Sequence, residues 1–225
     1  MPEEPSSPGD LSSPRVPTLP LPGKGRMLNV FIEDAIGPDH FVLRPFDSME
    51  LVSQLESDMD DFYENNVFPA ADCVPVSGAL YAAFVEEADA WERVCVKDIA
   101  QNGDVSVWGL DKGGYHVVSP ANLRPLDARF RVIPAQAMMG KLGGVVPAKG
   151  DKWTSPTEEL FRDLVQKKAF VGQLLSTPRS AGRRGHFRQV CLNLRLIDTS
   201  NPDRDVLVED VLVSKGHARA LALAE

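Results

Sequence analysis

"ALYAAFVEEADAWERVCVKDIAQNGDVSVWGLDKGGYHVVSPANLRPL", residues 79–126, is the stretch that decides the fold. It contains five short apolar segments separated by turns rich in Gly, Asn and Asp: residues 79–85, 91–100, 104–110, 115–120 and 122–126. Short strands joined by tight turns commonly close into a barrel, which removes exposed sheet edges. The stretch therefore predicts a small five-stranded β-barrel.

One polar turn interrupts this apolar stretch. In "VSVWGLDKGGYHVV", residues 105–118, the tetrapeptide at 111–114 breaks the alternation between two strands. Because side chains alternate across a strand, Gly109 shares a face with Val107, whereas Trp108 points to the other face. We therefore expect Trp108 to lie in the core.

The residues before the barrel predict a hairpin followed by a helix. Residues 27–36 and 41–46 are apolar strand segments with the turn "GPDH" between them. Residues 47–66 have apolar residues at helical spacing, with Asp47 or Ser48 at the N-cap. The apolar face predicted for this helix consists of Leu51, Leu55, Met59 and Phe62.

The residues after the barrel return to a mixture of helix and strand. The patterns predict a helix at 155–168, strands at 169–177 and 188–199, and a short strand followed by a helix at 205–225. Residues 130–147 read as a linker. The barrel thus interrupts a second domain in the sequence. The predicted fold class is α+β, mainly β with helices.

Residues 1–26 differ from the rest of the chain in composition, with seven prolines and no hydrophobic periodicity. Such a segment buries too little apolar surface to offset its loss of entropy, so we expect it to be disordered. Its three acidic and three basic residues cancel, so the formal net charge of −8 belongs to residues 27–225. An acidic domain attracts cationic partners and repels a phosphate backbone.

The sequence lacks the residue patterns of metal sites, cofactor sites and catalytic motifs. The four histidines show no metal-ligand spacing with one another or with the three cysteines, so we expect neither a metal nor a cofactor. No phosphate-binding loop or nucleophile motif occurs, and we expect no catalytic residues. The odd number of cysteines indicates free thiols in a reducing compartment.

The order of these segments resembles the extended Tudor domain. The resemblance rests on "MDDFY" in the predicted helix, "DVSVWGLDKGGYHVV" and "NLRPLDARFRVIPAQAM" in and after the barrel, and "LVEDVLVSKGHA" near the C-terminus. It covers residues 27–220. It implies a five-stranded Tudor barrel at 76–127, inserted into an OB-like, staphylococcal-nuclease-like lobe formed by 27–75 and 128–225.

The resemblance implies binding rather than catalysis. Extended Tudor domains bind arginine-rich segments, often symmetrically dimethylated, of Piwi-type and other germline ribonucleoproteins, and they surround the methylated guanidinium with aromatic rings. Methylation keeps the charge of arginine but blocks its bidentate hydrogen bonds, so ring faces suit the modified side chain. The implied setting is cytoplasmic, in perinuclear germ granules of the piRNA pathway, which silences genes through RNA during gametogenesis.

By resemblance, the peptide-binding cage falls on five positions of this sequence. They are Phe84 on the first barrel strand, Glu92 on the second, Gly109 before the polar turn, and Lys112 and Gly114 within it. Of these, only Phe84 keeps the residue type that the cage uses. Three lost rings, each worth on the order of 0.5–2 kcal/mol, predict weak or absent methyl-dependent binding. A carboxylate can hold unmodified arginine bidentately, so Glu92 predicts a methylation-independent site.

Other residues would add to this site or replace it. The accessory candidates lie in the neighbouring loop and turn: Glu86, Glu87, Asp89, Asp111 and Tyr115. If Tyr115 rebuilds the cage, the domain binds symmetric dimethylarginine. A third alternative is RNA binding by the OB-like lobe through the basic loop at 176–190, where Arg183 and Arg184 would contact phosphates.

Overall fold

The computed structural model describes residues 15–66, 74–181 and 187–221. The chain folds as two compact units. The barrel unit is built mainly from Met49–Gln136, and the lobe unit from Leu21–Ser48, Ala137–Ala181 and Gln189–Glu225. The barrel unit is thus inserted between two parts of the lobe unit in the sequence. The boundaries predicted at residues 26, 75 and 127 remain predictions.

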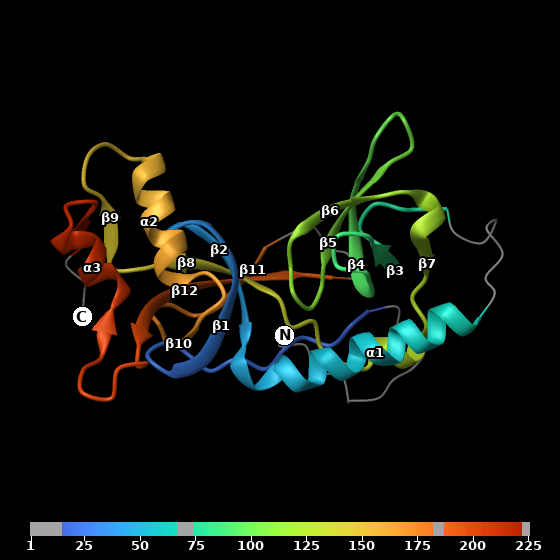
Figure 1. Cartoon of the computed structure of the whole chain (residues 1–225), viewed down its shortest axis with the longest axis horizontal. Coiled ribbons are helices and arrows are strands. Elements are labelled where there is room, and N and C mark those ends of the chain that lie inside the picture. Colours follow the sequence, from blue (N-terminus) through green and yellow to red (C-terminus); the bar gives the residue numbers. More distant parts are fainter. Residues whose placement is uncertain (1–14, 67–73, 182–186, 222–225) are drawn as a thin grey trace, which may run out of the picture. The chain divides into compact units, whose positions relative to one another are not determined.

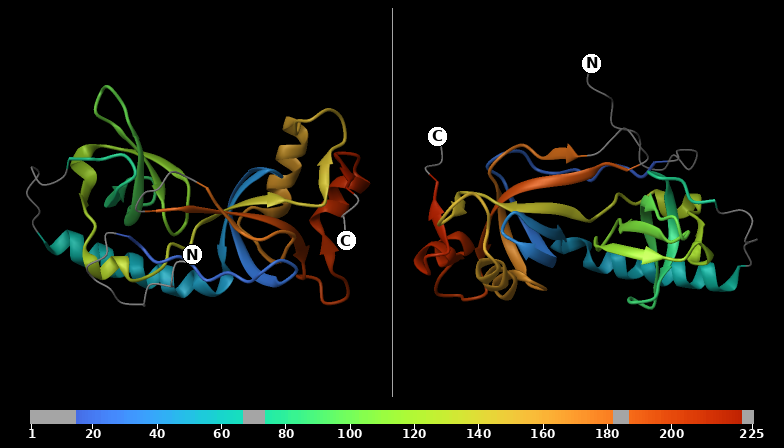
Figure 2. Two further views of the ribbon diagram at one scale, coloured as in Figure 1. Left: turned by 180° about the vertical axis from the view of Figure 1, so that it is seen from behind. Right: turned by 90° about the horizontal axis from the view of Figure 1, so that it is seen from above.

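All five predicted barrel strands are present, and all of their pairings are antiparallel, in the order β6-β5-β4-β3-β7 (Figure 1). The strands are β3 (Leu80–Val85), β4 (Ala90–Ile99), β5 (Val105–Gly109), β6 (Tyr115–Val118) and β7 (Leu123–Pro125). The 3-10 turns η3 (Pro120–Asn122) and η4 (Ala128–Arg131) flank β7. Helix α1 (Met49–Asn65) lies along one side of the sheet (Figure 2).

Alternation along the strands divides the side chains of the barrel unit between two apolar clusters. The inner cluster consists of Ala83, Val94, Val96, Val105, Val107, Val118 and Leu123. The outer cluster joins the other face of the strands to α1, and it includes Leu55, Met59, Tyr63, Leu80, Ala82, Trp91, Cys95, Leu110, Leu126 and Phe130. Helix and barrel therefore share one core.

The buried face of α1 is shifted from the predicted one. Its buried residues are Val52, Leu55, Met59 and Tyr63. Leu51 is 43% exposed, and Phe62 is half-buried beneath the guanidinium of Arg129. The two sets have the same helical period, so the period alone does not choose between adjacent apolar columns. Leu51 was therefore wrong as a residue of the buried face, whereas Phe62 packs against the outer cluster from its edge.

Five strands of the lobe unit close into a second barrel. They are β1 (Met27–Gly37), β2 (His40–Pro45), β8 (Met138–Leu142), β10 (Ala169–Leu174) and β12 (Gln189–Asp198). The pairings run β10-β1-β2-β8-β12 and return from β12 to β10, with β8 and β12 parallel. Helix α2 (Ser155–Val165) precedes β10 and packs on β1. This cyclic order agrees with the OB-like lobe that the resemblance implies.

The remaining elements of the lobe unit correct two predictions. They are β9 (Val145–Pro147), β11 (Arg179–Ala181), β13 (Val206–Leu207), α3 (Val208–Ser214), β14 (Ala218–Ala220) and the 3-10 turn η1 (Phe46–Ser48). The predicted linker at 130–147 contains strands β8 and β9. The last helix ends at Ser214. Gly216 follows it with a φ of +77°, which costs glycine little, and the chain continues as strand β14 instead of helix.

Part of the N-terminal segment is described. The Gly25 N–H donates to the carbonyl oxygen of Leu174 at 2.7 Å, and Val16 packs against the outer cluster. The disorder predicted for residues 1–26 stays a prediction for residues 1–14, which lie outside the described part of the chain. Among the described residues, no helix is long and apolar enough to cross a bilayer, and no three potential metal ligands cluster.

The rate at which the Cys95 thiol is alkylated tests whether helix α1 and the barrel share one core. Cys95 is 3% exposed in the outer cluster, and burial raises its pKa, so it lacks both access and thiolate character. We expect iodoacetamide at pH 8 to modify Cys95 more than about tenfold more slowly in the native protein than in 6 M guanidinium chloride. Peptide mass spectrometry measures both rates. Equal rates would show that helix and barrel separate readily.

Candidate functional site

A buried ion pair fixes the polar turn to the barrel. Arg93 on β4 is 1% exposed, and its guanidinium donates to both carboxylate oxygens of Asp111, at 2.8 and 2.5 Å. Its remaining donors reach the backbone carbonyl oxygens of Phe130, Ile133 and Pro134, at 2.7, 2.6 and 3.1 Å. Bidentate, charge-assisted bonds hold both side chains in one geometry. Asp111, an accessory candidate from the sequence, is therefore engaged within the domain.

The turn folds back onto Gly109. The Gly109 N–H donates to the Gly114 carbonyl oxygen at 3.1 Å, and Gly113 and Gly114 have φ angles of +74° and +90°, which only glycine adopts at little cost. A β-carbon at Gly109 would lie 2.8 Å from the Gly113 carbonyl oxygen and 3.2 Å from Oε2 of Glu92. Turn backbone and a carboxylate therefore fill the space that a ring at position 109 would need.

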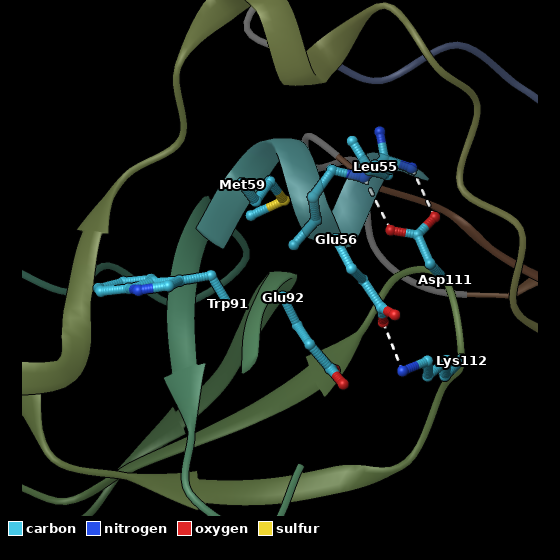
Figure 3. A pocket seen from close by; sticks show the side chains of 8 residues that line it. Leu55, Glu56, Met59, Trp91, Glu92, Asp111 and Lys112 are labelled. Atoms are coloured by element: carbon cyan, nitrogen blue, oxygen red, sulfur yellow. Dashed lines mark hydrogen bonds and ion pairs between the residues drawn. The ribbon is translucent and has the colours of Figure 1, made fainter. Parts of the chain in front are cut away.

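Two carboxylates and one ammonium group meet beside this turn. Glu92 lies opposite Ala83 in the strand register, on the inner side of β4, and is only 7% exposed. Oε1 of Glu56, on α1, lies 2.5 Å from Nζ of Lys112. Figure 3 shows Glu56 and Glu92 extending toward the turn that carries Lys112. The group therefore draws on a helix, a strand and a turn of the barrel unit.

These side chains line a small cavity. Its lining consists of Leu55, Glu56, Met59, Trp91, Glu92, Arg93, Asp111 and Lys112. The cavity has a volume of about 10 Å³, about what one water molecule needs. Apolar walls beside carboxylates suit the stem and the charged head of a long cationic side chain. A guanidinium can enter only if a lining side chain moves aside.

Phe84 lies on the other face of the same strands. It is opposite Trp91 in the register, and their ring centroids are 5.8 Å apart in an edge-to-face arrangement. Trp91 stacks on Tyr63 of α1 at 4.9 Å, and burial raises the pKa of the Tyr63 phenol to about 12. Phe84 and Glu92, which the sequence assigned to one cage, thus face different sides of the β3–β4 pair.

The acidic accessory candidates lie at the tip of the β3–β4 hairpin. Glu86, Glu87 and Asp89 are exposed there, and Glu86 accepts a hydrogen bond from the side chain of Asn122. None of them lines the cavity. These residues contribute to the electrostatic field of the barrel unit and not to the walls of the site.

Tyr115 does not turn toward the cavity. It is 61% exposed and packs edge-to-face on Trp108, with the ring centroids 4.9 Å apart. The register pairs Tyr115 with Trp108, on the face of β5 opposite to that of Gly109. Trp108 is 1% exposed, so the prediction that it lies in the core is confirmed.

The negative charge of the protein lies in the barrel unit. Residues 49–136 contain 15 acidic and six basic residues, a formal charge of −9, so the rest of the chain carries +1 of the total of −8. This charge favours a cationic partner for the barrel. Arg183 and Arg184, the predicted RNA contacts, lie outside the described residues.

Sequence reasoning missed Glu56. The helical pattern places it on a polar face of α1, and no local motif connects it with a turn that follows much later in the chain. The available signal was Lys112, because an ammonium group beside an arginine site requires an acidic partner. The fold supplies that partner from a helix outside the five barrel strands.

Comparisons with known proteins agree with this fold. The family model of the Tudor domain matches residues 22–144. Tudor domain-containing protein 7B of Danio rerio is 35% identical over 207 residues, which are 92% of this chain and 18% of that protein. The chain thus spans about a fifth of the length of the curated relatives that it matches.

Two crystal structures show the same fold. One is the extended Tudor domain of human TDRD1 in complex with a symmetrically dimethylated peptide (TM-score 0.79, 24% identity, 95% of this chain and 98% of that chain). The other is a variant of the Papi extended Tudor domain of Drosophila melanogaster, in complex with an unmethylated Piwi N-terminal peptide (TM-score 0.73, 17% identity, 87% and 100%).

Proposed function

Because the chain belongs to the Tudor domain family and has the extended Tudor fold, we propose that it binds arginine-containing peptides of Piwi-type partners through carboxylates instead of an aromatic cage. Tudor domains are binding modules and not enzymes. The proposed role is that of an adaptor in cytoplasmic germline ribonucleoprotein granules. Extended Tudor domains of the same fold are seen in complex with a peptide that contains dimethylarginine and with an unmethylated Piwi N-terminal peptide, which supports this class of partner.

The burial of Glu92 carries the proposal. Glu92 is 7% exposed, at a position where the family cage has a ring, and it lines one cavity with Glu56. A buried carboxylate binds a cation more strongly than an exposed one, because water screens it less. Unmodified guanidinium offers its full set of N–H donors to such a group, whereas methylation removes donors. The site therefore favours unmethylated arginine.

Peptide titration tests this preference. We expect an arginine-rich Piwi-type peptide to bind at least as tightly unmethylated as symmetrically dimethylated in isothermal calorimetry. Glu92→Gln should weaken the unmethylated peptide by about tenfold or more, because hydrogen bonds to charged groups contribute about 1.5–3 kcal/mol. The variant keeps the size of the side chain and removes its charge.

Glu87→Gln is the matched control, since it changes the net charge equally on the exposed hairpin loop. It should leave the affinity within about twofold. Tighter binding of the dimethylated peptide would instead identify a rebuilt cage. If Glu92→Gln leaves the affinity for the peptide unchanged, the peptide contacts another part of the domain. RNA binding that depends on Arg183 and Arg184 would favour the alternative, an RNA-binding role of the lobe.

A further inference from the structure

The cavity that Glu92 lines already has a partly exposed cation in its lining. Nζ of Lys112 lies 2.5 Å from Oε1 of Glu56, and the two side chains are 37% and 20% exposed. Lys112 and Glu56 line the cavity together with Glu92. Like the ligand that the site is proposed to take, Lys112 presents a cation at the end of an apolar stem to a carboxylate.

We infer that Lys112 is a tethered competitor for the arginine site, and that it lowers the affinity of the site for every incoming cation. This inference rests on the proposed function. A partner's guanidinium must displace the Lys112 ammonium from Glu56 before it can reach both carboxylates. Every partner cation therefore competes with the Lys112 ammonium for the Glu56 carboxylate.

The competitor can leave without disturbing the fold. The other cation of the cavity lining, Arg93, is 1% exposed and fully engaged by Asp111 and three carbonyl groups, so it cannot move. Lys112 has a long, flexible side chain and is more than one-third exposed. A partly exposed ion pair of this kind is weak, because water screens it. Its side chain can swing into solvent while the turn backbone stays in place.

The exchange favours arginine for a chemical reason. An incoming lysine would replace one ammonium group with another, so it would gain no new kind of bond at Glu56. A planar guanidinium has five donors in a rigid fork and can serve Glu56 and Glu92 together. The two carboxylates therefore favour arginine over lysine, and Lys112 weakens the binding of both.

Fluorescence anisotropy with the full chain tests the inference. The probes are an unmethylated arginine peptide and the same peptide with lysine in place of each arginine. We expect Lys112→Met to tighten the arginine peptide by about fivefold, the factor that a partly exposed ion pair is worth. The lysine peptide should gain by the same factor, because both peptides displace the same ammonium group, so the ratio of the two affinities should stay constant. Glu56→Gln should weaken both peptides, although it also releases Lys112.

Matched variants distinguish a failure of this inference from a failure of the proposed function. Lys149→Met removes one exposed positive charge from the lobe unit and should change neither affinity, and Lys112→Gln repeats the test with a polar side chain. If the wild-type protein binds and depends on Glu92, but both Lys112 variants bind no tighter, the inference is wrong while the proposed function stands. If neither the wild type nor a Lys112 variant binds arginine peptide, the proposed function fails and the inference with it.

Discussion

We expect Arg93→Ala to lower the free energy of unfolding by about 3–5 kcal/mol, because it leaves the carboxylate of Asp111 buried without its counter-ion. Asp111 is 8% exposed, so water cannot replace the lost partner fully. The substitution also removes the donors to the carbonyl oxygens of Phe130, Ile133 and Pro134. Urea denaturation followed by tryptophan fluorescence measures the change, since Trp91 and Trp108 lie in the same unit.

A double-mutant comparison separates the ion pair from simple loss of packing. Arg93→Met with Asp111→Leu removes both charges, so it should cost less than the sum of Arg93→Ala and Asp111→Ala. Arg129→Ala is the control, because the Arg129–Asp127 pair has side chains 60% and 35% exposed and should contribute at most about 1 kcal/mol. A loss below 1 kcal/mol for Arg93→Ala would mean that the turn is held by other contacts.

The same ion pair connects stability with binding. Arg93 follows Glu92 on β4, and Asp111 precedes Lys112 in the turn, so one buried contact positions both neighbours. Arg93→Ala should therefore lose peptide binding together with stability. Lys112→Met should change binding with little effect on stability, which distinguishes a group that competes with the peptide from one that holds the turn in place.

The strands of the barrel unit were predictable because each is short, alternates and ends at a turn residue. Alternation also placed Trp108 in the core correctly. Whether Leu51 or Val52 is the buried residue of α1 was not predictable. Both belong to apolar rows on adjacent sides of the helix, and only the packing of the barrel determines which row is buried. The strand after Gly216 was missed for a related reason, since its short apolar sequence also fits a helix and gains its partner from β9.

The candidate site was predictable only where one strand or turn carries it. Glu92 and Lys112 could be assigned by resemblance to a motif, whereas the backbone of Gly113 occupying the space beside Gly109 depends on how the turn folds. The pairing of Lys112 with Glu56 joins segments that are far apart in the sequence. The sequence therefore gives the residue types at the cage positions, whereas the contacts that these residues make depend on the fold.

The lobe unit has its own decisive contact, where Phe41 on β2 lies opposite Gly140 on β8. Phe41 is fully buried, and its ring lies 5.5 Å from that of Phe161. A β-carbon at Gly140 would come within 2.1 Å of the Phe41 ring, so the strand requires glycine for this close approach. We expect Phe41→Ala to lower the free energy of unfolding by about 3–5 kcal/mol, and Gly140→Ala by about 1–3 kcal/mol.

The two substitutions should not be additive. Phe41→Ala removes the ring with which the new methyl group at position 140 would clash, so the double variant should be less destabilised than the sum of the single variants. Gly150→Ala is a useful control, since a β-carbon there meets nothing within 4 Å and only its φ of +66° opposes the change. Calorimetry of the four proteins gives the coupling. Strict additivity would mean that β8 moves away from β2 to accept a side chain, and that the OB-type barrel is held by its hydrogen-bonded register more than by this contact.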